Sequence, residues 1–177
     1  MKRLFSILLV LTVGCAPWTQ VGGLHKNEKL NFSAELPLGW MKYNQSDTLI
    51  ITRDGVLLQY IQISRISVNE KLKNTKKKVT QGMTPHELAE VVIDDMASNQ
   101  HVLDFQVIEN SPLKISGIPG FRVGYTYRNE NGLRVKGLYC GCLSGEWLYA
   151  IVYTAPQRYY FDKDAETFER VLASFRL

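Results

Sequence analysis

Two cysteines separated by one glycine are the residues of this sequence best placed for chemistry. Cys140 and Cys142 lie in an apolar run, and residues two apart in a strand point to the same side of a sheet. Two strand steps place their Cα atoms about 6.6 Å apart, at the upper limit for a disulfide, and a bulge at Gly141 would relieve the backbone. Three interpretations stay open: buried core thiols, a strained disulfide, or a redox or soft-metal site.

A histidine and a glutamate four residues apart resemble part of the zinc-protease helix motif. His86 and Glu90 would share one face of a helix, but the motif requires histidine at both positions, and the sequence offers no evident third ligand. Thr84, Pro85 and Glu87 form a helix-capping signal that explains the same segment without a metal. We therefore expect no metal and no other cofactor.

The strongest local charge is a run of lysines. Residues 70–78 contain five lysines and one glutamate. Lys76, Lys77 and Lys78 are candidate partner-binding residues, since such a run attracts anionic lipid or an acidic protein. A solvated loop without binding function is the alternative.

A second candidate for partner binding is aromatic. Tyr159 and Tyr160 precede the last predicted helix, where exposed rings would form a docking patch. Packing of these rings into the core or at its rim is the alternative.

The composition excludes several classes of protein. The chain has 177 residues, 45% of them hydrophobic and 21% charged, as expected for one globular domain. Its net charge of +4 is spread among 17 acidic and 21 basic residues, so we expect no nucleic-acid partner. Neither a glycine-rich phosphate loop nor a nucleophile-elbow motif is present. We expect no catalytic residues and no enzyme activity.

The N-terminus has the pattern of an export signal. Lys2 and Arg3 precede an uncharged, mostly apolar run over 4–14, which is too short to span a bilayer. The run ends in Gly14-Cys15 and resembles the lipobox of bacterial lipoproteins. That resemblance implies cleavage after Gly14 and lipid attachment to Cys15. An ordinary secretory signal with a chance cysteine is the alternative.

The chain is accordingly predicted to have three parts. Residues 1–14 are the signal peptide, 15–29 are the lipidated cysteine and a tether, and 30–177 are the folded domain. The expected location is the cell envelope, with the lipid anchor in a bacterial membrane. The default is the periplasmic face of the outer membrane.

Hydrophobic periodicity predicts the elements of the domain. Two amphipathic helices are expected, over 84–99 and 162–175. Alternating or β-prone segments predict strands near 30–36, 49–51, 56–66, 102–108, 121–127, 133–143 and 146–154. Because hairpins predominate, we predict an α+β fold: an antiparallel sheet of about six strands flanked by helices in an α/β/α sandwich.

Three short motifs resemble those of the PsbP-like and DcrB-like proteins, a superfamily that includes Mog-like proteins. They are the strand and turn over 32–40 with its Pro-Leu-Gly-Trp sequence, the Ile118-Pro119-Gly120-Phe121 turn, and the closing segment 168–175. The resemblance covers about 30–177. It implies an antiparallel sheet between helices, and relatives that are mostly binding or assembly factors with no shared catalytic set.

Together these observations predict a non-catalytic envelope lipoprotein. Its PsbP-like domain would bind or help assemble another envelope component, with the membrane as a partner through the anchor and an unidentified protein as the other. The alternative is a thiol redox or soft-metal protein that uses Cys140 and Cys142.

Overall fold

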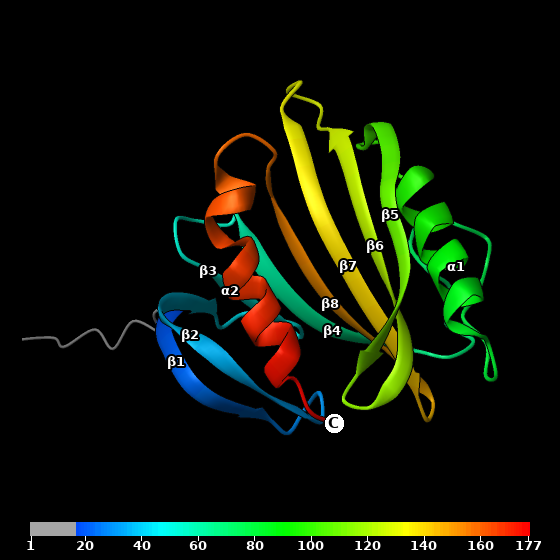
Figure 1. Ribbon diagram of the computed structural model, residues 1–177, viewed down its shortest axis with the longest axis horizontal. Helices are drawn as coiled ribbons and strands as arrows, with labels where there is room; N and C mark the ends of the chain where they lie inside the picture. The colour runs from blue at the N-terminus through cyan, green and yellow to red at the C-terminus, as the bar shows by residue number, and fades with distance from the viewer. Residues whose placement is uncertain (1–16) are drawn as a thin grey trace, which may run out of the picture.

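The computed structural model describes residues 17–177, so the predicted signal peptide and Cys15 lie outside the described residues. Within that part of the chain, one antiparallel sheet of eight strands carries two helices (Figure 1). The strand order is β1-β2-β3-β4-β8-β7-β6-β5. The elements are β1 (Trp18–Asn27), β2 (Phe32–Tyr43), β3 (Leu49–Thr52), β4 (Tyr60–Ser67), α1 (Pro85–Ala97), β5 (Leu103–Ile115), β6 (Ile118–Arg128), β7 (Arg134–Ser144), β8 (Trp147–Pro156) and α2 (Tyr160–Ser174).

Side-chain alternation along the central strands builds a core on each face of the sheet. In β8, Tyr149, Ile151 and Tyr153 pack in the cluster that contains α2, whereas Leu148 packs in the cluster that contains α1. The α1 helix covers β5, β6 and β7, and α2 packs on β2 and β8. The predicted arrangement of an antiparallel sheet with helices on its two faces is therefore confirmed.

The start of α1 forms as its sequence predicts. Thr84 caps the helix, and its hydroxyl accepts a hydrogen bond from the backbone N–H of Glu87. The Glu87 carboxylate accepts one in return from the backbone N–H of Thr84 at 2.7 Å, which completes the capping box. No helix in residues 17–177 is long and apolar enough to cross a bilayer.

The sheet has eight strands rather than about six. Residues 18–27, predicted as part of a tether, form β1 and pair with β2 from Trp18↔Tyr43 to Asn27↔Phe32. Gly22 and Gly23 weaken the local strand pattern, but the backbone groups of β2 supply partners for this edge strand. The tether predicted over 15–29 is therefore mostly a strand of the domain.

Two prolines, Pro37 and Pro112, lie within strands of the sheet. The Pro37-Leu38-Gly39 segment bulges where the β1–β2 register shifts, and β2 continues to Tyr43. Pro112 lies within β5, which is an edge strand of the sheet. An edge strand tolerates proline because its missing N–H can face away from the neighbouring strand.

Candidate functional site

Three loops that are distant in sequence meet at one end of the sheet. They are 53–59 after β3, 129–133 after β6, and 157–159 before α2, and we call these loops with the first turn of α2 the aromatic end (Figure 1). A cavity of about 650 Å³ opens there, lined by Leu58, Leu133, Arg134, Pro156, Gln157, Arg158 and Tyr160. Leu57 is 90% exposed beside it. The aromatic end is therefore an apolar surface with a hollow.

Tyr159 is held at this end in a strained conformation. Its φ is +73° with ψ −58°, and its side chain is 66% exposed. A side chain with a β-carbon rarely adopts this backbone geometry, which costs about 1–3 kcal/mol. The ring meets that of Tyr160 edge-on, with centroids 5.1 Å apart. Strain of this kind that presents an exposed aromatic ring is typical of a functional surface.

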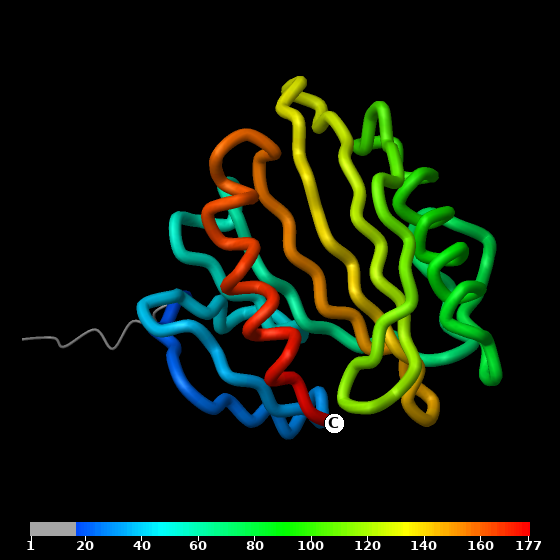
Figure 2. The backbone as a smooth tube through the Cα atoms, in the orientation of Figure 1, coloured from blue at the N-terminus to red at the C-terminus, as the bar shows by residue number. Residues whose placement is uncertain are grey.

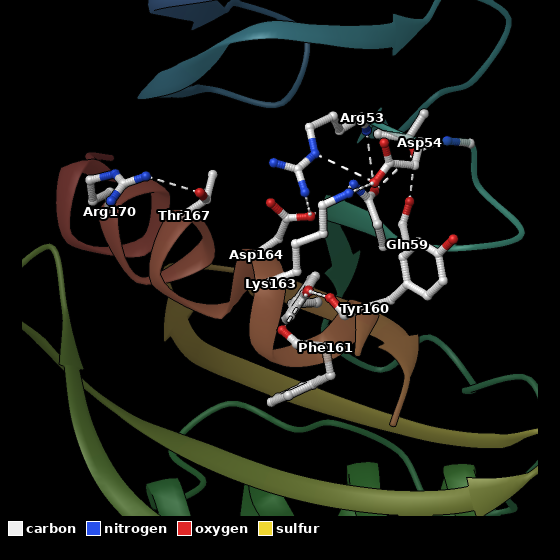
Figure 3. A network of polar contacts seen from close by, with 12 residues as sticks. Arg53, Asp54, Gln59, Tyr160, Phe161, Lys163, Asp164, Thr167 and Arg170 are labelled. Atoms are coloured by element: carbon white, nitrogen blue, oxygen red, sulfur yellow. Dashed lines mark hydrogen bonds and ion pairs between the residues drawn. The ribbon is translucent and has the colours of Figure 1, made fainter. Parts of the chain in front are cut away.

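An ion-pair network fastens the first of these loops to α2. Arg53 donates a hydrogen bond to Asp164 at 2.8 Å, and Lys163 donates one to Asp54 at 2.7 Å. Figure 3 shows the two pairs next to each other, each joining the loop to the helix, with the Gln59 side chain beside them. The Gln59 amide also donates to Asp164 at 3.2 Å. The network fixes the position of the loop that carries Leu57.

Asp164 is the buried member of this network. Its side chain is 1% exposed, and its Oδ1 has no hydrogen-bond partner among the described residues. Burial raises the pKa of this carboxyl above its ordinary value, although the charge of Arg53 opposes the shift. The group joins the loop to α2 through Arg53 and Gln59 and lies in the interior of the domain.

Two arginines give the aromatic end its charge. Arg134 and Arg158 line the cavity and are exposed, and neither forms an ion pair with another residue of 17–177. The backbone N–H of Gln157 donates to the Arg134 carbonyl at 2.9 Å, so the two arginine-bearing segments are joined. An apolar hollow with two free guanidinium groups is suited to a segment that combines an apolar side chain with a carboxylate.

The structure separates the two groups of predicted partner-binding residues. Tyr159 and Tyr160 lie at the aromatic end, whereas Lys76, Lys77 and Lys78 precede α1 on the other side of the molecule (Figure 2). The lysine segment is held by burial of hydrophobic side chains on either side of it, and Lys77 pairs with Asp94 at 3.3 Å. The lysines and tyrosines therefore do not form one surface.

The cysteine pair lies in the core. Cys140 and Cys142 are both free thiols, and each is fully buried on the face of the sheet that α2 covers. Burial raises the pKa of Cys140 to about 12 and that of Cys142 to about 11. Because the thiolate is the reactive form, these surroundings oppose a redox or metal-binding role.

The histidine and glutamate of α1 form a surface ion pair. His86 Nε2 lies 3.3 Å from Glu90 Oε1, and both side chains are exposed. Residues 17–177 contain no group of three histidine, cysteine, aspartate or glutamate residues that is arranged to hold a metal ion. The predicted capping role explains this segment.

Sequence reasoning identified the tyrosines of the aromatic end but missed its other residues. Leu133 directly follows the Asn131-Gly132 turn, and Leu57 lies two residues after Gly55. An apolar residue within two positions of a turn signal is a sign of an exposed hydrophobic side chain. The sequence gives no sign that these turns meet.

The architecture of the sheet and its two helices defines the fold class of the protein. The chain adopts the fold of the PsbP/Mog1-like proteins. No protein-family model matches its sequence, and no curated protein matches it either.

Several solved structures are similar to the structure of this chain. The chain is similar to cyanobacterial PsbP (CyanoP) from Synechocystis sp. PCC 6803, with a TM-score of 0.60 and 13% identity over 95% of this chain and 96% of that one. It is also similar to the Ran-binding protein Mog1p of Saccharomyces cerevisiae, with a TM-score of 0.57 and 9% identity over 89% and 96%. LpqN of Mycobacterium tuberculosis, described as involved in cell envelope biogenesis, gives a TM-score of 0.52 and 13% identity over 90% and 89%. At these identities the likeness establishes the fold alone.

Proposed function

We propose that this protein is a non-catalytic lipoprotein of the bacterial cell envelope whose aromatic end binds a protein partner. The observation that carries the proposal is the apolar hollow between three loops, with strained and exposed Tyr159 at its rim. The partner segment has an apolar side chain that enters the hollow and a carboxylate that meets Arg134 or Arg158. The protein acts by holding this partner at the membrane.

The names of similar proteins support a binding role of this kind. Mog1p is named as Ran-binding, and LpqN is described as acting in cell envelope biogenesis. Both share the fold of this chain without close sequence identity. A fold that serves as a binding scaffold elsewhere is consistent with a binding surface here.

The location in the envelope rests on the N-terminal signal. The lipobox-like Gly14-Cys15 sequence supports cleavage and acylation at Cys15, and several acyl chains on one cysteine anchor a protein stably. Mass spectrometry of the membrane-extracted protein tests this directly. A mature chain that begins at Cys15 with acyl groups is expected, and Cys15→Ser is expected to release or mislocalise the protein.

Site-specific photo-crosslinking in the native envelope tests partner binding. A photo-crosslinking amino acid at position 57 or 159, both at the aromatic end, is expected to capture the same protein. The same probe at position 76, in the lysine segment, is the control and is expected to capture none of it. Equal capture from all three positions, or none from 57 and 159, would contradict the proposal.

Charge reversal tests the chemistry of the partner. Arg134→Glu together with Arg158→Glu is expected to weaken capture about tenfold or more, because two charge-assisted contacts become repulsive. Lys76→Glu with Lys78→Glu is the matched control, since both lysines are exposed, form no ion pair within residues 17–177, and undergo the same change of charge elsewhere on the surface. Equal losses in both double variants would point to general electrostatic attraction instead.

A further inference from the structure

The β1–β2 hairpin carries an apolar patch on its outer face. Val21 pairs with Trp40, which is buried in the core, so the residues adjacent to this pair point away from the core. The Trp18↔Tyr43 pair lies three residues further along and therefore faces outward. We call five outward residues of the two strands the hairpin patch: Trp18, Leu24, Leu38, Met41 and Tyr43.

The side chains of the hairpin patch are held at the surface by their local geometry. Leu38 is 86% exposed and Leu24 is 62% exposed. Leu38 lies across Gly22, whose β-carbon, if present, would be 2.5 Å from a Leu38 methyl group. The rings of Trp18 and Tyr43 pack together with centroids 4.9 Å apart. The absence of a β-carbon at Gly22 therefore permits the exposed Leu38 side chain to lie flat across β1.

The hairpin patch begins close to the proposed lipid anchor. Three residue steps separate Cys15 from Trp18, and a fully extended chain covers only about 10 Å in that distance. Acyl chains on Cys15 would therefore bring the first residues of β1 to the bilayer interface. Tryptophan and tyrosine are the side chains enriched at that depth.

The charges around the hairpin patch indicate which lipids it meets. Lys26 and Glu35 flank the patch on the same outer face, as their pairing with Ser33 and Leu24 shows, and both are exposed. Their opposite charges offset each other, so the patch offers no electrostatic attraction to anionic headgroups. We therefore expect the hairpin patch to contact the apolar part of the membrane interface rather than charged headgroups.

We infer that bilayer lipid covers the hairpin patch, so that the outer face of the β1–β2 hairpin rests in the membrane interface. This inference rests on the proposed anchoring at Cys15 and adds the orientation of the domain. The acyl chains and the patch then act as two membrane contacts on one short stretch of chain. The curled hairpin lies at the edge of the sheet where the described chain begins (Figure 2).

Tryptophan fluorescence of the lipidated chain in vesicles tests the inference. Trp40 is buried in the core. Trp147, the first residue of β8, packs against the Arg65 guanidinium of β4. Trp18 is therefore the tryptophan expected to meet lipid. Brominated phosphatidylcholine is expected to quench the native chain and to have little effect on Trp18→Phe. Adding phosphatidylglycerol to the vesicles is expected to leave the quenching unchanged.

A leucine variant tests the role of the patch beyond the tryptophan itself. Leu38→Asp is expected to reduce the quenching of Trp18, because the charge lifts the hairpin out of the interface. Leu57→Asp is the matched control, since Leu57 is as exposed as Leu38 but lies at the aromatic end. The tryptophan fluorescence of the control is expected to be quenched as strongly as that of the native chain.

The outcomes separate this inference from the proposed function. An acylated, vesicle-bound chain in which Trp18 is not quenched overturns the inference and leaves partner binding and anchoring intact. Quenching that requires anionic lipid, or that is equal in Leu38→Asp and the native chain, also overturns it. A mature chain without acyl groups overturns both the anchor and the orientation that depends on it.

Discussion

The Arg53 guanidinium donates a 2.8 Å hydrogen bond to the buried carboxylate of Asp164, and this contact ties the loop after β3 to the second turn of α2. Arg53 is one-third exposed whereas Asp164 is almost fully buried. The pair therefore joins a surface loop to the interior of the domain. The loop it holds carries Leu57 and Leu58 to the aromatic end.

Replacing the buried carboxyl is expected to change how stability depends on pH. Burial raises the pKa of Asp164 above its unfolded value of 3.8, so its contribution to stability is present below that value and is lost as pH rises through the folded pKa. As pH rises from acidic to neutral, the free energy of unfolding of Asp164→Asn should therefore increase relative to that of the native protein. Urea unfolding at several pH values measures this difference.

Asp54→Asn provides the opposite control. The hydrogen bond from Lys163 holds the pKa of Asp54 below its ordinary value, so its contribution is present above the unfolded pKa and is lost as pH falls. The variant should lose stability relative to the native protein as pH rises from acid to neutral. Parallel profiles for the two variants would contradict the assignment of Asp164.

The strain at Tyr159 predicts a conflict between stability and binding. Tyr159→Gly relieves the positive φ at the cost of backbone entropy, and we expect a net gain of about 1 kcal/mol in the free energy of unfolding. Partner capture should fall, because the exposed ring is gone. Tyr159→Ala loses the same ring but keeps a β-carbon, so it should bind as weakly without the gain in stability. Equal stability of the two variants would show that the backbone carries no strain.

Reagents specific for thiols test the state of the core cysteines. Since burial raises the pKa of Cys140 to about 12 and that of Cys142 to about 11, the folded protein should react very slowly at mildly alkaline pH. In denaturant both thiols should react at the rate of an ordinary cysteine. Fast reaction of either thiol in the native protein would favour the redox alternative.

Close packing between β6 and β7 predicts the effect of one added methyl group. A β-carbon at Gly137 would overlap the phenol ring of Tyr125, whose hydroxyl hydrogen-bonds Thr154 at 3.2 Å. Gly137→Ala is expected to cost about 1–3 kcal/mol of unfolding free energy. In a Tyr125→Leu background the same change should cost much less, because the clashing ring is absent. An equal cost in both backgrounds would assign the effect to the strand backbone instead.

Much of the fold could be predicted from local patterns. The capping box placed α1, and the apolar spacing in 162–175 indicated α2. These signals are local, since a cap and one helix face are set by residues a few positions apart. The strand count was wrong for the opposite reason: β1 is held by its pairing with β2, and its own glycines give a weak signal.

Local sequence patterns are enough to predict the antiparallel α+β fold, the capping of α1, the apolar run before Cys15 and the aromatic character of Tyr159 and Tyr160. That Leu58, Leu133 and Tyr160 share one hollow, and that the thiols are buried, follows from the three-dimensional packing instead. Periodicity shows which side of an element is apolar, because residues a few positions apart set that side. Which turns meet depends on strand order and on the packing of α2, and these arise from contacts between residues about 100 positions apart, such as Arg53 with Asp164.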